Sequence, residues 1–128
     1  MPRPLRQSYQ LKITLNGSKP PIWRRILVPD SIKLDVFNDA VQIAMGWTNS
    51  HLHEFFCSGR YYGEPDPDFA DFKEVLAEGK YRLNQLLKAE KDKLLYTYDF
   101  GDNWEHTIIL EKSCRLTPPQ VCPAVLKL

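Results

Sequence analysis

Hydrophobic residues occupy every second position of residues 9–15, with polar residues between them. A period of two indicates a half-buried β-strand. Asn16-Gly17 favours a turn, and residues 22–28 are predicted to return as a second strand after two prolines. The chain is therefore expected to begin its folded part with a hairpin that has a rather long loop.

The spacing changes to that of an amphipathic helix between Leu34 and Met45, where apolar residues recur at intervals of three and four. Asp35 suits the positive end of the helix dipole. Gly46 can adopt the left-handed conformation that ends a helix. Trp47 is then expected to fold back onto the core.

The remaining elements are predicted to be shorter. They are a strand at residues 51–57, an exposed acidic loop at 63–72, short helices at 72–77 and 82–89, and strands at 94–98 and 104–111. Residues 99–103 join the last two strands around Gly101, which predicts a hairpin turn.

This order predicts an α+β domain in which one principal helix packs across a mainly antiparallel, mixed sheet, and a β-grasp-like arrangement fits it. With 128 residues, of which 43% are hydrophobic and 12% aromatic, the chain can bury a core as a single domain over residues 1–128. No stretch approaches the roughly 20 apolar residues of a membrane-spanning helix, so no membrane partner is expected.

The net charge of the chain argues mainly against non-specific binding to nucleic acid or membranes. The 17 basic and 16 acidic residues give a formal charge of +1, so the chain has no overall attraction for nucleic acid or membranes, although a local patch stays open. Arg24 and Arg25 form the most compact basic pair. Alternation places them on opposite faces of a strand, which argues against a joint phosphate clamp.

The cysteines are Cys57, Cys114 and Cys122. Their odd number and the absence of an apolar signal segment predict reduced thiols in a cytoplasmic protein. Cys114 and Cys122 could pair if the protein were secreted. Cys57 shares a strand face with histidines, but a buried strand cysteine explains it better than a nucleophile does.

Several motifs agree in order with one known family. They are Pro21-Ile22-Trp23-Arg24-Arg25, Val28-Pro29, Met45-Gly46-Trp47, His51-Leu52-His53-Glu54-Phe55 and Tyr96-Thr97-Tyr98-Asp99-Phe100-Gly101-Asp102-Asn103-Trp104-Glu105-His106. From Tyr9 to Cys122 the chain resembles the plasmid pRiA4b ORF-3-like family of bacterial and archaeal proteins, some of them carried on plasmids and insertion elements. The resemblance implies association with mobile elements and no established enzymatic activity.

The chain departs from this family in two places. Asn38 stands where relatives often carry histidine. Relatives usually continue beyond the Cys-Pro segment into a glycine-rich tail, whereas this sequence stops at Leu128, so the domain is either shortened at its C-terminus or lacks that tail. Some relatives are labelled transposon resolvases, but no serine here lies among arginines that could hold a scissile phosphate, so we reject serine recombination.

The three histidines could form a metal site. His51 and His53 lie two positions apart on one predicted strand, so their imidazoles would share a face. With His106, and with Asp99 or Asp102 as a further ligand, they could bind a divalent metal; no other cofactor is expected. The alternative is that the histidines hydrogen-bond backbone or carboxylate groups and brace the sheet. No close-spaced signature such as HExxH is present.

Asp99 and Asp102 lie on either side of Gly101. Two close carboxylates could divide acid and base roles. A tight hairpin favours the same residues, because an Asp side chain bonds turn amides and Gly accepts a positive φ. We favour the turn interpretation, and we expect Trp104, like Trp47, to anchor the core.

The sequence therefore predicts a small non-catalytic interaction module with an unknown protein or nucleic-acid partner. The candidate binding residues are His51, His53, Asp99, Asp102, Trp104 and His106. The competing hypothesis is a metal-dependent, hydrolase-like site built from the same residues, with Asp99 or Asp102 as base for a metal-bound water. Both hypotheses require residues 51–57 to lie beside the turn at 99–103.

Overall fold

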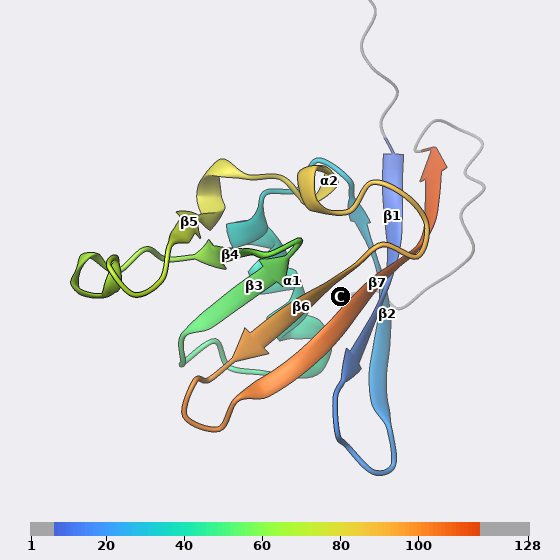
Figure 1. Ribbon diagram of the computed structural model, residues 1–128. Helices are drawn as coiled ribbons and strands as arrows, with labels where there is room; N and C mark the ends of the chain where they lie inside the picture. The colour runs from blue at the N-terminus through green and yellow to red at the C-terminus, as the bar shows by residue number, and fades with distance from the viewer. Residues whose placement is uncertain (1–6, 116–128) are drawn as a thin grey trace, which may run out of the picture.

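One seven-stranded sheet and one principal helix form the part of the chain that the computed structural model describes, residues 7–115 (Figure 1). The strands are β1 (Gln7–Leu15), β2 (Ile22–Pro29), β3 (His53–Cys57), β4 (Arg60–Gly63), β5 (Val75–Ala77), β6 (Lys93–Tyr98) and β7 (Trp104–Arg115). The helices are α1 (Leu34–Met45) and α2 (Leu83–Leu86), with 3₁₀ turns η1 (Pro67–Phe69) and η2 (Glu78–Lys80).

The strands lie in the order β2-β1-β7-β6-β3-β4-β5. Neighbouring strands pair antiparallel, except that β4 and β5 pair in parallel. The sheet is therefore mixed and mainly antiparallel, with one main helix, which confirms the predicted α+β class. Both predicted hairpins, β1–β2 and β6–β7, are present, and the β1–β7 pairing joins them into one sheet.

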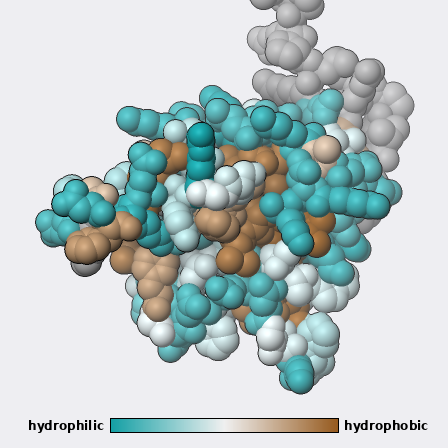
Figure 2. Space-filling view, in the orientation of Figure 1, coloured by the Kyte–Doolittle hydropathy of each residue, from teal (hydrophilic) through white to brown (hydrophobic). Residues whose placement is uncertain are grey.

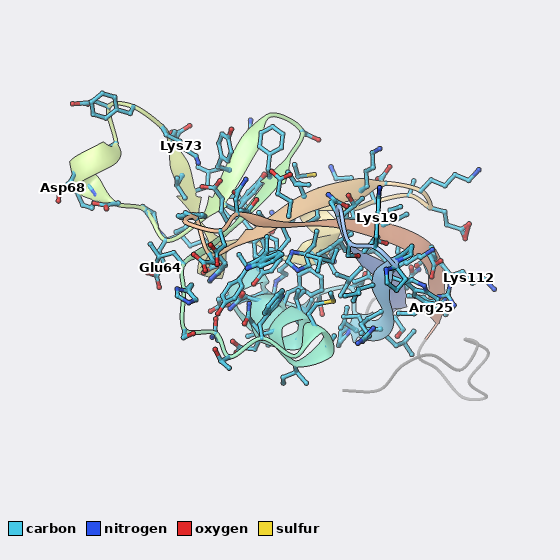
Figure 3. The ribbon with its side chains drawn as sticks, turned by 90° about the horizontal axis from the view of Figure 1, so that it is seen from below. Lys19, Arg25, Glu64, Asp68, Lys73 and Lys112 are labelled. Carbon is cyan, nitrogen blue, oxygen red and sulfur yellow. The ribbon has the colours of Figure 1, made fainter. Side chains whose placement is uncertain are left out.

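Side-chain alternation gives the sheet two different faces. The inner face is covered by α1, which lies on one side of the sheet in Figure 3. The outer face is turned toward the viewer in Figure 2, where hydrophobic side chains gather over the centre of the sheet and hydrophilic ones surround them. The fully buried members of the inner core include Leu11, Ile13, Ile26, Phe37, Phe55, Ile108 and Leu110.

Helix α1 has the bounds that its hydrophobic spacing predicts. Gly46 ends the helix with a φ of 79°, the left-handed conformation expected of it. Trp47 then packs against the core, as predicted. On the helix itself, Phe37 stacks on Phe55 of β3 with ring centroids 5.8 Å apart, so α1 is seated directly on the centre of the sheet.

A layer of polar side chains is buried where α1 meets the sheet. The Tyr96 hydroxyl accepts a hydrogen bond from Gln42 Nε2 at 2.7 Å and donates one to Asn38 Oδ1. Gln42 and Asn38 also bond the backbone and the side chain of Asn49, at 2.8 and 3.1 Å. Burial raises the pKa of the Tyr96 phenol, so the hydroxyl stays protonated and can keep both roles.

The edge of the sheet differs from the sequence prediction. Residues 72–77 are predicted as a helix, which is wrong, because Val75–Ala77 pairs with β4 as strand β5. Strand β4 is not predicted at all. Strand β5 forms because β4, from an earlier part of the chain, offers it hydrogen-bonding partners, and local sequence does not encode that. Strand β4, in contrast, pairs with its neighbour β3 across the tight Ser58-Gly59 turn, a local signal that the prediction missed. The predicted helix at 82–89 is reduced to α2, and the predicted strand at 51–57 begins only at His53.

The two cysteines within the described residues differ in their bonding state. Cys57 is free and buried, and its Sγ lies 3.7 Å from the carbonyl oxygen of Leu86. Cys114 is disulfide-bonded, so the expectation of reduced thiols is wrong there; an odd cysteine count does not exclude one bridge. Cys122 lies outside the described residues. Within residues 7–115, no helix has the length and apolar character needed to cross a membrane.

The polar layer beneath α1 gives a stability prediction. Tyr96→Phe removes the hydroxyl and leaves polar atoms of Asn38 and Gln42 unpaired in the core. We expect the free energy of unfolding to fall by about 1–3 kcal/mol in urea denaturation. Tyr61→Phe, which removes a hydroxyl from the outer face, is the matched control and should change it by less than about 0.5 kcal/mol. Equal losses in both variants would contradict the bridging role.

Candidate functional site

The predicted site residues lie at one end of the sheet, where the β6–β7 turn meets the start of β3. Tyr98, at the end of β6, is paired with His53 on one side and with Trp104 on the other. The strand that begins at His53 therefore lies beside the final turn, as the sequence predicts. The six predicted side chains nevertheless do not form one cluster, although His51 lies beside Asp99.

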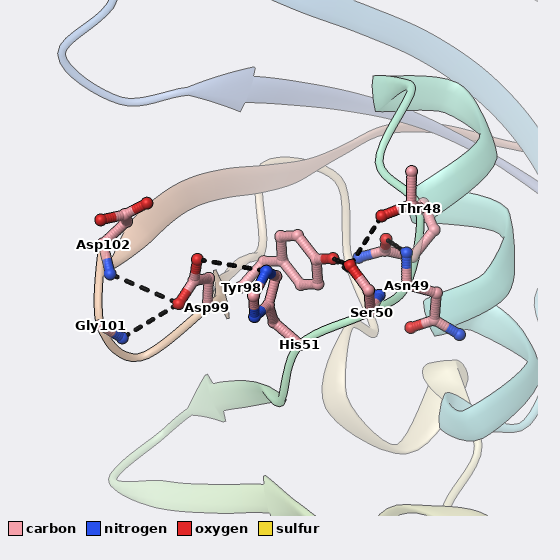
Figure 4. A network of polar contacts seen from close by, with 9 residues as sticks. Thr48, Asn49, Ser50, His51, Tyr98, Asp99, Gly101 and Asp102 are labelled. Atoms are coloured by element: carbon pink, nitrogen blue, oxygen red, sulfur yellow. Dashed lines mark hydrogen bonds and ion pairs between the residues drawn. The ribbon is translucent and has the colours of Figure 1, made fainter.

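Asp99 holds the turn between β6 and β7 (Figure 4). Its Oδ1 accepts hydrogen bonds from the backbone N–H groups of Gly101 at 3.1 Å and Asp102 at 3.4 Å. Asp99 also has a φ of 63°, a conformation that aspartate tolerates better than most residues. The Asp102 side chain is exposed. The two aspartates thus build a turn, which supports the structural interpretation over a carboxylate pair.

His51 lies just before β3 and is held in place from β6. The backbone N–H of Ser50 donates to the Tyr98 hydroxyl at 2.9 Å, and the His51 ring meets the Tyr98 ring edge-on at 5.7 Å. His51 Nε2 lies 3.7 Å from Asp99 Oδ2. The His51 side chain is 54% exposed, so this histidine is available to a ligand.

His106 is fully buried and both of its ring nitrogens are occupied. Nε2 lies 3.1 Å from Trp47 Nε1, which can only donate, so Nε2 is the acceptor. Nδ1 lies 3.0 Å from the carbonyl oxygen of Tyr96, which can only accept, so Nδ1 carries the proton. Burial lowers the pKa of His106. The residue is therefore a neutral imidazole that joins β6, β7 and Trp47.

Trp47 and Trp104 cover this buried histidine. Their rings are 5.7 Å apart and tilted by 30°, and the edge of His106 meets Trp47 at 6.1 Å. Trp47 is partly buried and packs against the core, whereas Trp104 is 40% exposed. Trp104 is thus an outer cover of the core rather than a fully buried anchor.

His53 pairs with Glu78, a residue that the sequence does not single out. His53 Nε2 lies 2.7 and 2.9 Å from the two carboxylate oxygens of Glu78. The side chains are only 13% and 8% exposed. Because Glu78 lies in η2, well away from His53 along the chain, no local sequence signal links the two. Their contact ties the start of β3 to the segment after β5.

The predicted metal ligands do not come together. Among the residues that the structure describes, no group of three or more His, Cys, Asp or Glu side chains could hold a metal ion. His106 uses both nitrogens inside the core, and His53 is engaged by Glu78. The predicted ligands His51, His53 and His106 do not converge in the structure. The Tyr96 ring packs against both His53 and His106, and His51 packs against Tyr98.

A pocket of about 540 Å³, here called the end pocket, opens beside His51 and His53. It lies between the start of β3 and the segment that connects β4 to β5. Its residues are Asn49, His51, Leu52, His53, Glu54, Gly63, Glu64, Asp66, Phe72, Lys73, Val75 and Phe100. Sequence analysis proposed only the two histidines as site residues, because the apolar members come from separate segments that only the fold brings together.

Lys73 fastens the outer wall of the end pocket to the sheet. Its ammonium lies 2.7 Å from Glu54 Oε2 and 4.0 Å from the centre of the Tyr61 ring. Both partners belong to the sheet, on β3 and β4. A salt bridge together with a cation–π contact holds the connecting segment in place, so the pocket has a defined wall.

The buried His53–Glu78 pair predicts strong energetic coupling. His53→Leu leaves the Glu78 carboxylate buried without its partner, and we expect the free energy of unfolding to fall by about 3 kcal/mol. The double variant His53→Leu/Glu78→Leu should recover most of this loss, because no buried charge is left. Urea denaturation of the single and double variants measures the coupling. Simple addition of the two single losses would show that the pair is not coupled.

The buried neutral His106 predicts a pH dependence of stability. Its pKa is lowered in the folded state, so the unfolded chain binds a proton that the folded protein excludes. Stability should therefore rise with pH below about 6.5, with a limiting slope of about 1.4 kcal/mol per pH unit from this group. His106→Gln should flatten this slope. An unchanged slope in His106→Gln would assign the dependence to another group.

One curated relative of this chain is described as uncharacterized. The chain is 40% identical over 104 residues to Uncharacterized protein y4hQ of Sinorhizobium fredii (strain NBRC 101917 / NGR234), covering 81% of this chain and 53% of that protein. It thus spans about half the length of this curated relative.

Its fold is also similar to the crystal structure of a protein of unknown function, MM3350 from Methanosarcina mazei Go1. The TM-score is 0.80 and the identity 31%, over 97% of this chain and 70% of that chain. A family profile described as plasmid pRiA4b ORF-3-like protein matches residues 7–127. In agreement with the motifs, the chain belongs to the plasmid pRiA4b ORF-3-like family.

Proposed function

We propose that the domain is a binding module that takes an apolar side chain of a partner protein into the end pocket. The supporting observation is the pair of exposed phenylalanines at this pocket: Phe72 is 85% exposed and Phe100 is 48% exposed. Leu52, also in the lining, is 61% exposed. Large apolar side chains gathered around a hollow of this size are typical of a recognition site.

The shape of the surface favours an extended peptide. A second hollow, of about 370 Å³, lies on the outer face and shares Glu54, Lys73 and Phe100 with the end pocket. Its further lining includes Phe56 and Leu95. Two adjacent hollows suit a chain segment that places one side chain in the end pocket and a following one in the second hollow.

The charge around the end pocket favours a basic protein segment. Residues 64–74, here called the acidic segment, contain five carboxylates and one basic residue, Lys73. Lys73 is already paired with Glu54. This local negative charge repels nucleic-acid phosphates and attracts lysine and arginine side chains. The partner is therefore a protein segment with basic residues around its apolar anchor.

The polar residues at this end favour binding over catalysis. Asp99 holds its turn, His106 has both nitrogens bonded inside the core, and His53 is paired with Glu78. Each of these groups already has a partner within the fold and stabilises this end of the sheet. His51 is the exposed member and can contribute a hydrogen bond to the bound segment.

The proposal predicts that Phe72 is a binding residue. The probes are synthetic peptides in which one leucine, isoleucine, methionine, phenylalanine or tryptophan is flanked by two lysines on each side. Titration into the ¹⁵N-labelled domain should shift the backbone amides of Leu52, Gly63 and Val75. Phe72→Ser should weaken binding of the best peptide by about fivefold or more, because it removes an apolar anchor contact.

Ile43→Ser is the matched control, since Ile43 on α1 is 63% exposed and lies away from the pocket. It should change the affinity by less than about twofold. Replacing the flanking lysines by glutamates should abolish binding. The proposal fails if no peptide shifts these amides, or if Phe72→Ser and Ile43→Ser have the same effect.

A further inference from the structure

A row of cations crosses the outer face, away from the end pocket. Strand register places Arg25 on β2 beside Lys12 on β1, Lys12 beside Ile109 on β7, and Ile109 beside Lys93 on β6. Neighbouring strands are about 4.8 Å apart, so the row spans roughly 14 Å. We call these three cations, Arg25, Lys12 and Lys93, the basic row.

Trp23 lies next to the basic row on the same face. It is two residues before Arg25 on β2, and its ring lies 4.9 Å from Lys12 Nζ and 5.1 Å from Arg25 Cζ. Trp23 is still 42% exposed. Two cations therefore pack on the indole ring, and the residue keeps substantial exposure to solvent.

Further cations surround the neighbouring hollow of about 560 Å³. Its charged lining residues are Arg25, Lys91, Lys112 and Glu111. Glu111 accepts two hydrogen bonds from Arg25, at 2.6 and 3.1 Å, and this contact lowers the pKa of Glu111. The lining of this hollow thus contains one ionised carboxylate and three basic side chains.

The charges of the two ends of the molecule are opposite. In Figure 3, Arg25 and Lys112 lie at one end, and Glu64 and Asp68 of the acidic segment lie at the other. The formal charge of +1 for the whole chain therefore conceals a basic surface at this end of the sheet. This surface is separate from the end pocket.

We propose that this surface binds a single-stranded nucleic acid, with phosphates along the basic row and one base stacked on Trp23. Sheet faces that combine cations with exposed aromatic rings recognise unpaired nucleotides in this way, because phosphates need positive charge and every base has a planar face. A duplex keeps its bases stacked inside, so it could use only the cations. The proposal is independent of the peptide proposed for the end pocket.

The test measures the fluorescence anisotropy of a labelled 12-nucleotide oligothymidylate with the purified domain at 50 mM salt. Lys12→Glu or Lys93→Glu should weaken binding by about tenfold. Lys80→Glu, the same charge change at an exposed residue of η2, should have little effect. In wild type, log K should fall with log salt, and Lys12→Ala should reduce the magnitude of the slope by about 0.7.

Two further variants separate nucleotide recognition from attraction of any polyanion. Trp23→Ala should weaken oligonucleotide binding by about tenfold, Trp23→Phe less, and neither should change binding of inorganic polyphosphate. Glu111→Gln removes the carboxylate that competes for Arg25 and should tighten oligonucleotide binding by about two- to fivefold. A purely structural role of Glu111 would not produce tighter binding.

Several outcomes would overturn the proposal. The first is that the oligonucleotide does not bind at 50 mM salt, or that the protein self-associates in a salt-sensitive way instead of binding it. The second is that Lys80→Glu and Lys12→Glu have equal effects. The third is that Trp23→Ala weakens polyphosphate binding and oligonucleotide binding equally. Phe72→Ser should leave oligonucleotide binding unchanged, so failure here and failure of the peptide proposal are distinguishable.

Discussion

The hydroxyl of Tyr96 fixes helix α1 to the sheet, and the geometry of the end of the sheet that carries the end pocket depends on this buried bond. It accepts from Gln42 and donates to Asn38, while the main-chain carbonyl of the same residue accepts the Nδ1 proton of His106. One residue of β6 thus sets the positions of both the helix and the last strand. Buried polar groups need partners, so α1 cannot slide without leaving some unpaired. The segment that leads from α1 into β3 is thereby held in place.

This end of the sheet has a closed side and an open side. On the closed side, His106 is a neutral imidazole sealed beneath Trp47, and its bonds are those of a scaffold. On the open side, Phe72 and Phe100 are exposed around the end pocket. Two of the three histidines, His53 and His106, therefore belong to the framework around the pocket, since each is bonded to another part of the fold. His51, exposed beside Asp99, is the histidine that stands at the boundary between the two.

The overall charge of the chain conceals how its charges are distributed. Arg25, where the basic row begins on edge strand β2, lies at the end of the molecule opposite the acidic segment. Because exposed charges act over about 10 Å at ordinary ionic strength, each end presents its own field to a partner. A basic protein segment and a nucleic acid would thus be directed to different surfaces of one small domain. Such a domain could hold two partners of opposite charge without competition between them.

Local sequence patterns suffice to predict α1 with its Gly46 cap, the two hairpins and the Asp99 turn, because helical periodicity, side-chain alternation and turn chemistry depend on neighbouring residues. The motifs also identify the family. Which side chains meet in the fold cannot be read from these patterns. The His53–Glu78 pair, strand β5 and the sealed His106 depend on contacts between segments far apart in the sequence. The spacing of hydrophobic and polar residues along the chain does not encode such contacts, because the partner of each buried polar group depends on packing and strand pairing.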